Sequence, residues 1–162
     1  MGKTLAKTSD ALYERDFHAW LMDQAERLRA RSHNDIDWDN LAEEVESVGI
    51  SQKSEISDRL GVLLMHLLKW EHQPSRRGHS WQSTISERRL SISKLLKTNP
   101  SLKRYPEETL DWSYRWAVRR AAYETGLPER SFPAEAPYSV PQILDYEFMP
   151  GPPWSPDSLI RD

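Results

Sequence analysis

The residues best suited to chemistry lie in a polar connection at residues 70–81, which reads Trp-Glu-His-Gln-Pro-Ser-Arg-Arg-Gly-His-Ser-Trp. Arg76 and Arg77 stand side by side there, and His79 follows two positions later. Paired guanidinium groups can hold a phosphate or a carboxylate through parallel hydrogen bonds. The tryptophans at the two ends could stack on a base or a peptide. The connection is therefore a candidate site for an anionic ligand or partner.

Arg88 and Arg89 extend this candidate set, but a structural role explains the same residues. Trp70 and Trp81 fall at the helical spacing of the neighbouring apolar residues, which predicts that both anchor a core. The two later arginines also lie near that apolar stripe, and a basic side chain on a packed face needs a partner. We expect the acidic helix that begins after Asp37 to supply this partner.

Carboxylates and histidines offer a second kind of chemistry. Glu14 and His18 are four residues apart, Glu43 and Glu46 are three apart, and His66 interrupts an apolar run. A helical bundle could gather such side chains around a metal, and a metal-dependent enzyme is therefore one alternative. However, carboxylate-bridged bundles use Glu-x-x-His pairs, which the sequence lacks. We predict no metal and no cofactor, no catalytic residue is assigned, and His66 is predicted to be a hydrogen-bonded packing residue.

Charge is distributed unevenly along the chain. The formal net charge is −3 and the isoelectric point is about 6.0, whereas a nucleic-acid-binding domain more often lies above about 9. Residues 35–58 hold eight acids against Lys53 and sum to −7, while residues 69–104 hold nine bases against two acids and sum to +7. Such runs are usually solvated helix faces. The bulk charge argues against nucleic acid, although the basic run leaves anion or nucleic-acid binding through the arginines as an alternative.

Several other classes of protein lose their usual sequence support. The glycines are too scattered for a phosphate-binding loop, and the common serine-hydrolase and zinc-protease motifs do not occur. With no cysteine, a disulfide framework or thiolate site is excluded, which suits a reducing cytosol. A membrane-spanning helix needs about 18 consecutive apolar residues, and the sequence contains no such run. We therefore expect a cytoplasmic protein with no membrane partner.

Helical periodicity dominates the elements that must position these residues. Asp10 is expected to cap a helix over residues 10–31, and Asp37 the next helix. The apolar stripe of that second helix continues from Leu41 past Gly49 to Trp70. A single helix over this length would span about 50 Å, and the expected globule is only about 40 Å across. Gly49 therefore predicts a break between a short helix and a longer one.

Two more helices and a proline-rich segment complete the predicted fold. The third helix includes Trp81 and stops at Asn99-Pro100, and the fourth runs over residues 106–126. From Pro128 onward many prolines alternate with large apolar residues, which predicts a wrap with one short helix capped by Ser139. The predicted fold is an all-α bundle of four main helices, with a short extra helix and a proline-rich C-terminal wrap. We expect a flexible segment at residues 1–9, one helical domain over residues 10–150 and a tail at residues 151–162.

The fourth helix suggests a way for two copies to associate. Ser113, Ala117 and Ala121 are four residues apart and form a ridge of small side chains. Small side chains allow helices to approach closely. We therefore predict homodimerisation through this ridge.

Four blocks of sequence carry a resemblance to a known family. They are Tyr-Glu-Arg-Asp-Phe-His-Ala-Trp at residues 13–20, Asp-Trp-Asp-Asn-Leu-Ala-Glu-Glu at 37–44, Leu-Leu-Met-His-Leu-Leu-Lys-Trp at 63–70, and Tyr-Glu-Thr-Gly-Leu-Pro at 123–128. In this order they resemble domain of unknown function 29. The resemblance implies a helical fold of bacterial origin and brings no catalytic residues with it. The prediction for function is accordingly a non-enzymatic binding or protein-interaction module.

Overall fold

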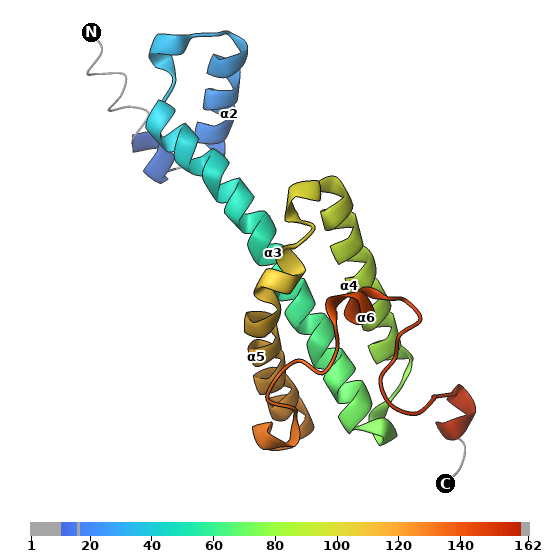
Figure 1. The fold of residues 1–162 in the computed structure, drawn as a ribbon. Helices are drawn as coiled ribbons and strands as arrows, with labels where there is room; N and C mark the ends of the chain where they lie inside the picture. The colour runs from blue at the N-terminus through green and yellow to red at the C-terminus, as the bar shows by residue number, and fades with distance from the viewer. Residues whose placement is uncertain (1–10, 16, 160–162) are drawn as a thin grey trace. The chain divides into compact units, whose positions relative to one another are not determined.

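The computed structural model describes residues 11–15 and 17–159, and all regular secondary structure among them is helical (Figure 1). The four long helices are α2 (Phe17–Arg29), α3 (Trp38–His72), α4 (His79–Thr98) and α5 (Tyr105–Thr125), and α6 (Val140–Leu144) is short. The predicted all-α bundle with four main helices is thus confirmed. The predicted cap at Asp10 and the segment 1–9 lie outside the described residues.

The chain divides into two compact units, residues 1–51 and residues 52–162. We call them unit 1 and unit 2 and describe each by itself. The prediction of one domain over residues 10–150 stays a prediction. Among the described residues, no helix combines the length and the apolarity that crossing a lipid bilayer requires.

The predicted break at Gly49 was wrong, because α3 is one continuous helix of 35 residues. No separate short helix exists between residues 38 and 48. A glycine inside a helix costs only about 1 kcal/mol relative to alanine, which neighbouring turns can offset. The length argument failed because it placed the whole helix inside one globule, whereas its residues are shared between two units.

Unit 1 contains α2 and the first part of α3, joined through a short 3-10 turn at His33–Asp35. The backbone N–H of Asp37 donates to Gln24 Oε1 at 2.8 Å, and Trp20 Nε1 donates to Asp37 Oδ2 at 3.3 Å. The other carboxylate oxygen of Asp37 accepts the N–H of Asn40 at 3.4 Å, which confirms the predicted helix cap. Trp20 and Gln24 are fully buried, so the polar side chain of Gln24 ties α2 to the start of α3.

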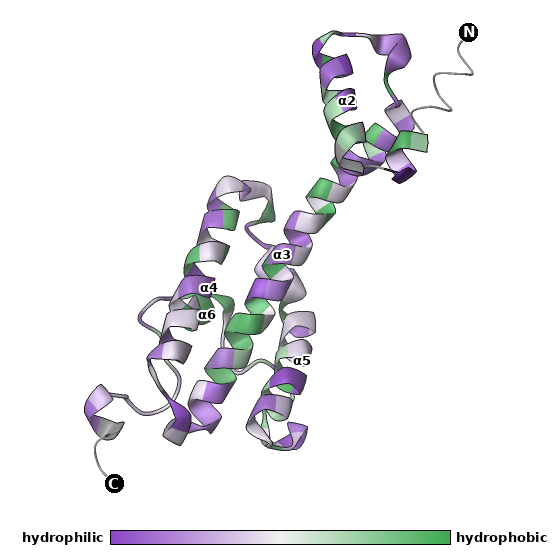
Figure 2. Ribbon diagram, turned by 180° about the vertical axis from the view of Figure 1, so that it is seen from behind, coloured by the Kyte–Doolittle hydropathy of each residue, from purple (hydrophilic) through white to green (hydrophobic). Residues whose placement is uncertain are grey.

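Unit 2 is built around the remainder of α3, which lies between α4 and α5 (Figures 1 and 2). From Ile56 onward the apolar stripe of α3 is buried, as predicted; Ile56, Leu60, Leu63 and Leu67 are all fully covered. The same stripe is exposed earlier on the helix. Val45 and Val48 are 67% and 61% exposed, so helical spacing there does not coincide with burial.

The small-residue ridge of α5 does bring two helices close together, but both belong to the same chain. Ser113, Ala117 and Ala121 are fully buried, and Ser113 Oγ donates to the carbonyl oxygen of Ser57 on α3 at 3.0 Å. Gly61 lies opposite, where an added Cβ would come within 2.9 Å of the Trp116 ring. Since the ridge is covered inside unit 2, it is not available for the predicted homodimer contact.

The C-terminal segment covers unit 2 as the sequence predicts. Gly126 adopts the left-handed conformation with φ 73° and ends α5, which releases the chain into the proline-rich segment. Ser139 caps α6 in a reciprocal capping box with Gln142. The wrap contributes buried apolar side chains to the main core; they are Phe132, Tyr138 and Ile143.

Candidate functional site

Arg77 is one of two arginines that the structure places in a structural role. Its side chain is 4% exposed, and it lies over the Trp70 ring with 5.2 Å between the guanidinium carbon and the ring centroid. Nε donates to the carbonyl oxygen of Trp70 at 2.7 Å, and the terminal nitrogens donate to Pro152 at 2.7 Å and Pro150 at 3.5 Å. Burial lowers the pKa of Arg77, and the charge of Glu71 opposes that shift. Its donors already bind backbone carbonyls, so little remains for an external anion.

Arg89 has the same kind of environment on α4. The side chain is fully buried, and Nε donates to the Ile143 carbonyl oxygen at 2.8 Å while one terminal nitrogen donates to that of Phe148 at 2.7 Å. Burial lowers its pKa, and the charge of Asp145 acts in the opposite direction. The prediction that acids near the start of α3 pair with this arginine was wrong. Backbone carbonyls of the C-terminal segment satisfy it instead.

The remaining three candidate residues do not join Arg77 and Arg89 in one site. Arg76 is exposed at the end of a 3-10 turn (Pro74–Arg76), and His79 is exposed with its ring 5.4 Å from that of Trp154. Arg88 is half-buried, and its Nε has no hydrogen-bond partner among the described residues. Of the two tryptophans that flank the connection, Trp70 is buried in the core and Trp81 is packed against it. Arg76 and Arg77 therefore do not form the predicted paired anion site. Arg77 is buried and bound to backbone carbonyls, and only Arg76 is exposed.

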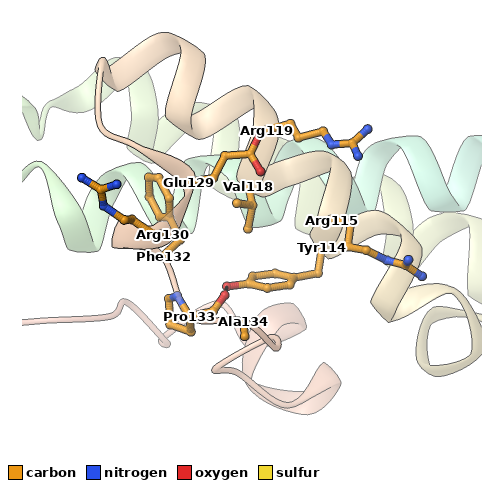
Figure 3. A pocket seen from close by; sticks show the side chains of 9 residues that line it. All are labelled: Tyr114, Arg115, Val118, Arg119, Glu129, Arg130, Phe132, Pro133 and Ala134. Carbon is orange, nitrogen blue, oxygen red and sulfur yellow. Dashed lines mark hydrogen bonds between the residues drawn. The ribbon is translucent and has the colours of Figure 1, made fainter.

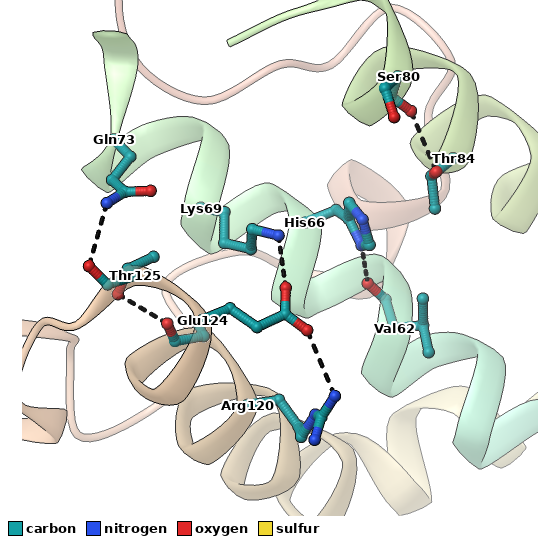
Figure 4. Close-up of polar contacts among 10 residues, drawn as sticks. Val62, His66, Lys69, Gln73, Ser80, Thr84, Arg120, Glu124 and Thr125 are labelled. Carbon is teal, nitrogen blue, oxygen red and sulfur yellow. Dashed lines mark hydrogen bonds and ion pairs between the residues drawn. The ribbon is translucent and has the colours of Figure 1, made fainter. Parts of the chain in front are cut away.

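His66 lies beside a partly buried ion pair that links α3 to α5 (Figure 4). Lys69 Nζ donates to Glu124 Oε2 at 2.6 Å and lies 4.6 Å from the centroid of the Trp81 ring. Burial alone would raise the pKa of Glu124, but the hydrogen bond and charge of Lys69 together with Arg120 lower it overall. His66 Nδ1–H donates to the Val62 carbonyl oxygen at 2.9 Å, in agreement with the predicted hydrogen-bonded histidine.

The carboxylates and histidines considered for a metal do not gather into a ligand set where the structure describes them. Within the described ranges no group of three histidine, aspartate or glutamate side chains could hold a metal ion. Glu14, Glu43 and Glu46 are exposed, and the side chain of His18 lies outside the described part.

A pocket of about 580 Å³ lies between α5 and the segment after it (Figure 3). Its lining combines a buried aromatic floor with a charged rim and comprises Tyr114, Arg115, Val118, Arg119, Glu129, Arg130, Phe132, Pro133 and Ala134. Tyr114 and Phe132 are 1% and 5% exposed. The Tyr114 hydroxyl donates to the Pro133 carbonyl oxygen at 2.7 Å, which fixes one wall of the pocket to the other. Burial and the charge of Glu71 raise the pKa of Tyr114 to about 12, so the floor is uncharged at neutral pH.

Three arginines and one glutamate stand at the rim of this pocket, giving a formal charge of +2. Arg115 forms an exposed ion pair with Asp111 one turn earlier. Within the described residues, the side chains of Arg119 and Arg130 form no hydrogen bond or ion pair. The arrangement can hold an apolar group on the floor and an anionic group at the rim.

Sequence reasoning missed this pocket because its arginines do not cluster in the sequence. Arg115 and Arg119 are one turn apart on α5, and Arg130 follows the turn at Gly126 that redirects the chain. The available signal was the combination of this i, i+4 arginine pair with Arg130 in a short loop before Phe132. The three arginines indicate a common site only when the segment after Gly126 is known to fold back along α5.

Comparison with known proteins gives a family and no nearer relative. No curated protein and no solved structure matches the chain. The sequence model of the family described as "Domain of unknown function DUF29" matches residues 12–149, in agreement with the four sequence blocks. Because this match covers most of its length, the chain belongs to the DUF29 family.

Proposed function

We propose that the protein is a non-enzymatic protein-interaction module whose unit 1 binds a basic amphipathic helix of a partner protein. The lack of cysteine suits such an encounter in the reducing cytosol of a bacterium. The observation that carries the proposal is the incomplete covering of the apolar side chains in unit 1.

Unit 1 exposes more large apolar side chains than it buries. Among its described side chains only Trp20 and Ile36 are buried apolar residues. Seven large apolar side chains are at least 37% exposed, namely Leu21, Met22, Leu28, Trp38, Val45, Val48 and Ile50. A unit of this size gains little stability from its own core, and association is a common remedy. A further helix lying along Val45 and Val48 would bury part of this exposed apolar surface.

The charge of unit 1 selects the kind of helix that fits. Asp39, Glu43 and Glu46 are exposed on the same part of α3 as Val45 and Val48. An amphipathic helix docks through its apolar face, and lysine or arginine beside that face would complement these acids. Unit 1 of a second copy of the chain would instead place acidic side chains opposite acidic side chains, which repel each other.

A second copy of the chain is an alternative partner through a different surface. On α4, Leu90 is 62% exposed, and Lys94 and Lys97 are exposed at positions four and seven residues later. This face has the chemistry that the acidic apolar surface would accept. Homodimerisation therefore remains a second candidate, now without the buried ridge of α5.

The proposal can be tested with a fluorescent synthetic helix that carries leucine on one face and lysine on the other. Its matched control carries glutamate in place of each lysine. In anisotropy titrations of the full chain, we expect the lysine peptide to bind about tenfold more tightly or better, with an affinity that falls as salt rises. Equal binding of the two peptides, or no binding of either, would contradict the proposal.

Two variants place the interaction on the molecule. The double substitution Val45→Ser with Val48→Ser removes two exposed apolar side chains and should weaken peptide binding by about tenfold or more. Leu90→Ser removes an equally exposed apolar side chain from α4 and should leave peptide binding unchanged. Light scattering on the parent, the double variant and Leu90→Ser tests the homodimer alternative. A parent dimer that Leu90→Ser dissociates would identify a second copy of the chain as the partner.

A further inference from the structure

We propose that the pocket between α5 and residues 129–134 binds a small organic anion, namely a carboxylate or phosphate ester carried on an apolar body. This site lies within unit 2 and does not depend on the interaction proposed for unit 1. It also differs in position from the Arg76 and Arg77 connection that the sequence favoured.

The floor of the pocket suits the apolar body of such a ligand. Tyr114 and Phe132 are almost completely buried and form the base beneath the pocket, while half-buried Val118 and exposed Pro133 and Ala134 supply accessible apolar surface above them. The hydrogen bond from the Tyr114 hydroxyl to Pro133 fixes the floor before any ligand arrives. The volume of about 580 Å³ falls in the range of small-molecule sites, which are mostly apolar with a few polar groups.

The rim supplies the groups that would bind the charged end. Neither Arg119 nor Arg130 forms an ion pair among the described residues, although Glu129 stands at the same rim, while Arg115 is engaged only in an exposed pair with Asp111. Such exposed pairs contribute little free energy, so Arg115 can exchange Asp111 for a ligand. The guanidinium groups lie apart around the rim in Figure 3. Exposed side chains change rotamer within nanoseconds, so an anion can recruit them.

Other cationic groups of unit 2 are less suited to this role. The donors of Arg77 and Arg89 bind backbone carbonyls of the same chain. Lys69 is buried against Glu124, which already supplies its counter-charge. The pocket is thus the place where unengaged guanidinium groups stand beside a formed apolar floor.

Three probes separate the contributions of charge and apolar body. Naphthalene-2-carboxylate has both, 2-naphthalenemethanol has the same body without the charge, and inorganic phosphate has charge without the body. Calorimetric titration of the full chain should show naphthalene-2-carboxylate binding about tenfold more tightly than either of the other two. NMR shift mapping should place its largest shifts at Val118, Phe132 and Ala134. Adding 2-naphthyl phosphate identifies the preferred headgroup, since the tighter of the two anions names it.

Variants test whether the rim and the floor act as proposed. Arg119→Gln with Arg130→Gln should weaken naphthalene-2-carboxylate binding by about tenfold or more, because two charge-assisted contacts are lost. Arg76→Gln removes an equally exposed arginine elsewhere and should have no effect. Ala134→Trp places an indole in the pocket and should abolish binding. Each variant should retain the circular dichroism spectrum of the parent, because all these side chains are exposed.

Several outcomes would overturn the proposal. Binding of 2-naphthalenemethanol as tightly as the carboxylate would remove the role of the arginines. Equal binding of inorganic phosphate and 2-naphthyl phosphate would remove the role of the floor. Loss of binding in Arg76→Gln but not in the rim double variant would return the anion site to the sequence-predicted connection.

Discussion

The Nε–H of Arg89 on α4 donates to the carbonyl oxygen of Ile143, near the end of α6, at 2.8 Å. The last carbonyls of a helix have no partner within the helix, and this hydrogen bond satisfies one of them. The same guanidinium also donates to the carbonyl oxygen of Phe148 at 2.7 Å. A fully buried cation thus holds the C-terminal segment through backbone atoms, and no carboxylate of the described residues forms an ion pair with it.

Substitution of Arg89 by methionine should destabilise unit 2 more than any exposed arginine change. Methionine fills much of the volume but leaves the carbonyls of Ile143 and Phe148 buried without donors. Each orphaned group costs about 1–3 kcal/mol, so for the two carbonyls we expect a loss of about 2–6 kcal/mol in the free energy of unfolding. Urea denaturation measures it. The control Arg76→Met should change stability by no more than about 0.5 kcal/mol, and an equal effect of both substitutions would refute the role assigned to Arg89.

The hydrogen bonds of Arg77 to the C-terminal segment predict that alanine at Gly151 lowers stability more than alanine at Gly126. Gly126 and Gly151 both have positive φ, 73° and 82°, so alanine at either should cost about 1 kcal/mol in backbone strain. At Gly151 the added Cβ would also come within 2.6 Å of a terminal nitrogen of Arg77. At Gly126 nothing lies within 4 Å. Thermal unfolding should therefore show Gly151→Ala to be the more destabilising of the pair, by about 1 kcal/mol or more, because the buried guanidinium must give up carbonyl contacts.

The sequence predicted most helices because their signals are local. The ends of α5, the cap at Asp37 and the capping box at Ser139 each depend on residues within a few positions of one another. Arg77 donates to Pro150 and Pro152, and Arg89 to Ile143 and Phe148; all four are backbone carbonyls more than fifty residues away, which no side-chain type reveals. Long-range acceptors of this kind could not be inferred from residue type or spacing.

The length of α3 shows a second limit of sequence reasoning. Its apolar stripe keeps helical spacing throughout, but only the part from Ile56 onward is buried. Periodicity identifies the face of a helix that could be covered and leaves open whether other residues of the chain cover it. The pocket below Arg119 was missed for a related reason, since its two walls meet only after the chain turns at Gly126.

The continuity of α3 can be tested at the glycine where the sequence predicted a break. At Gly49 an added Cβ would meet nothing within 4 Å, and the residue lies inside the helix. Gly49→Ala should raise the helical signal in circular dichroism and stabilise the helix by about 0.5–1 kcal/mol. Gly61→Ala is the contrasting variant, because Trp116 occupies that space. A destabilising Gly49→Ala would indicate that Gly49 has the left-handed conformation of a helix end.

His66 should make the stability of unit 2 depend on pH in a predictable direction. Burial lowers its pKa below the usual 6.5, and the nearby charge of Lys69 acts in the same direction, although the hydrogen bond to Val62 opposes them. The unfolded chain therefore binds a proton at a higher pH than the folded chain does. Stability should rise with pH up to and through about 6.5 and fall as the pH drops from there toward the folded-state pKa.

Urea unfolding of parent and His66→Gln at pH 5.5 and 7.5 isolates this contribution. The parent should lose more stability than His66→Gln on acidification, because only the parent must protonate an unfolded histidine at this position. His33→Gln alters an exposed histidine of unit 1 and should follow the parent. If His66→Gln and the parent lose stability equally on acidification, burial of His66 in the folded chain does not favour its neutral imidazole.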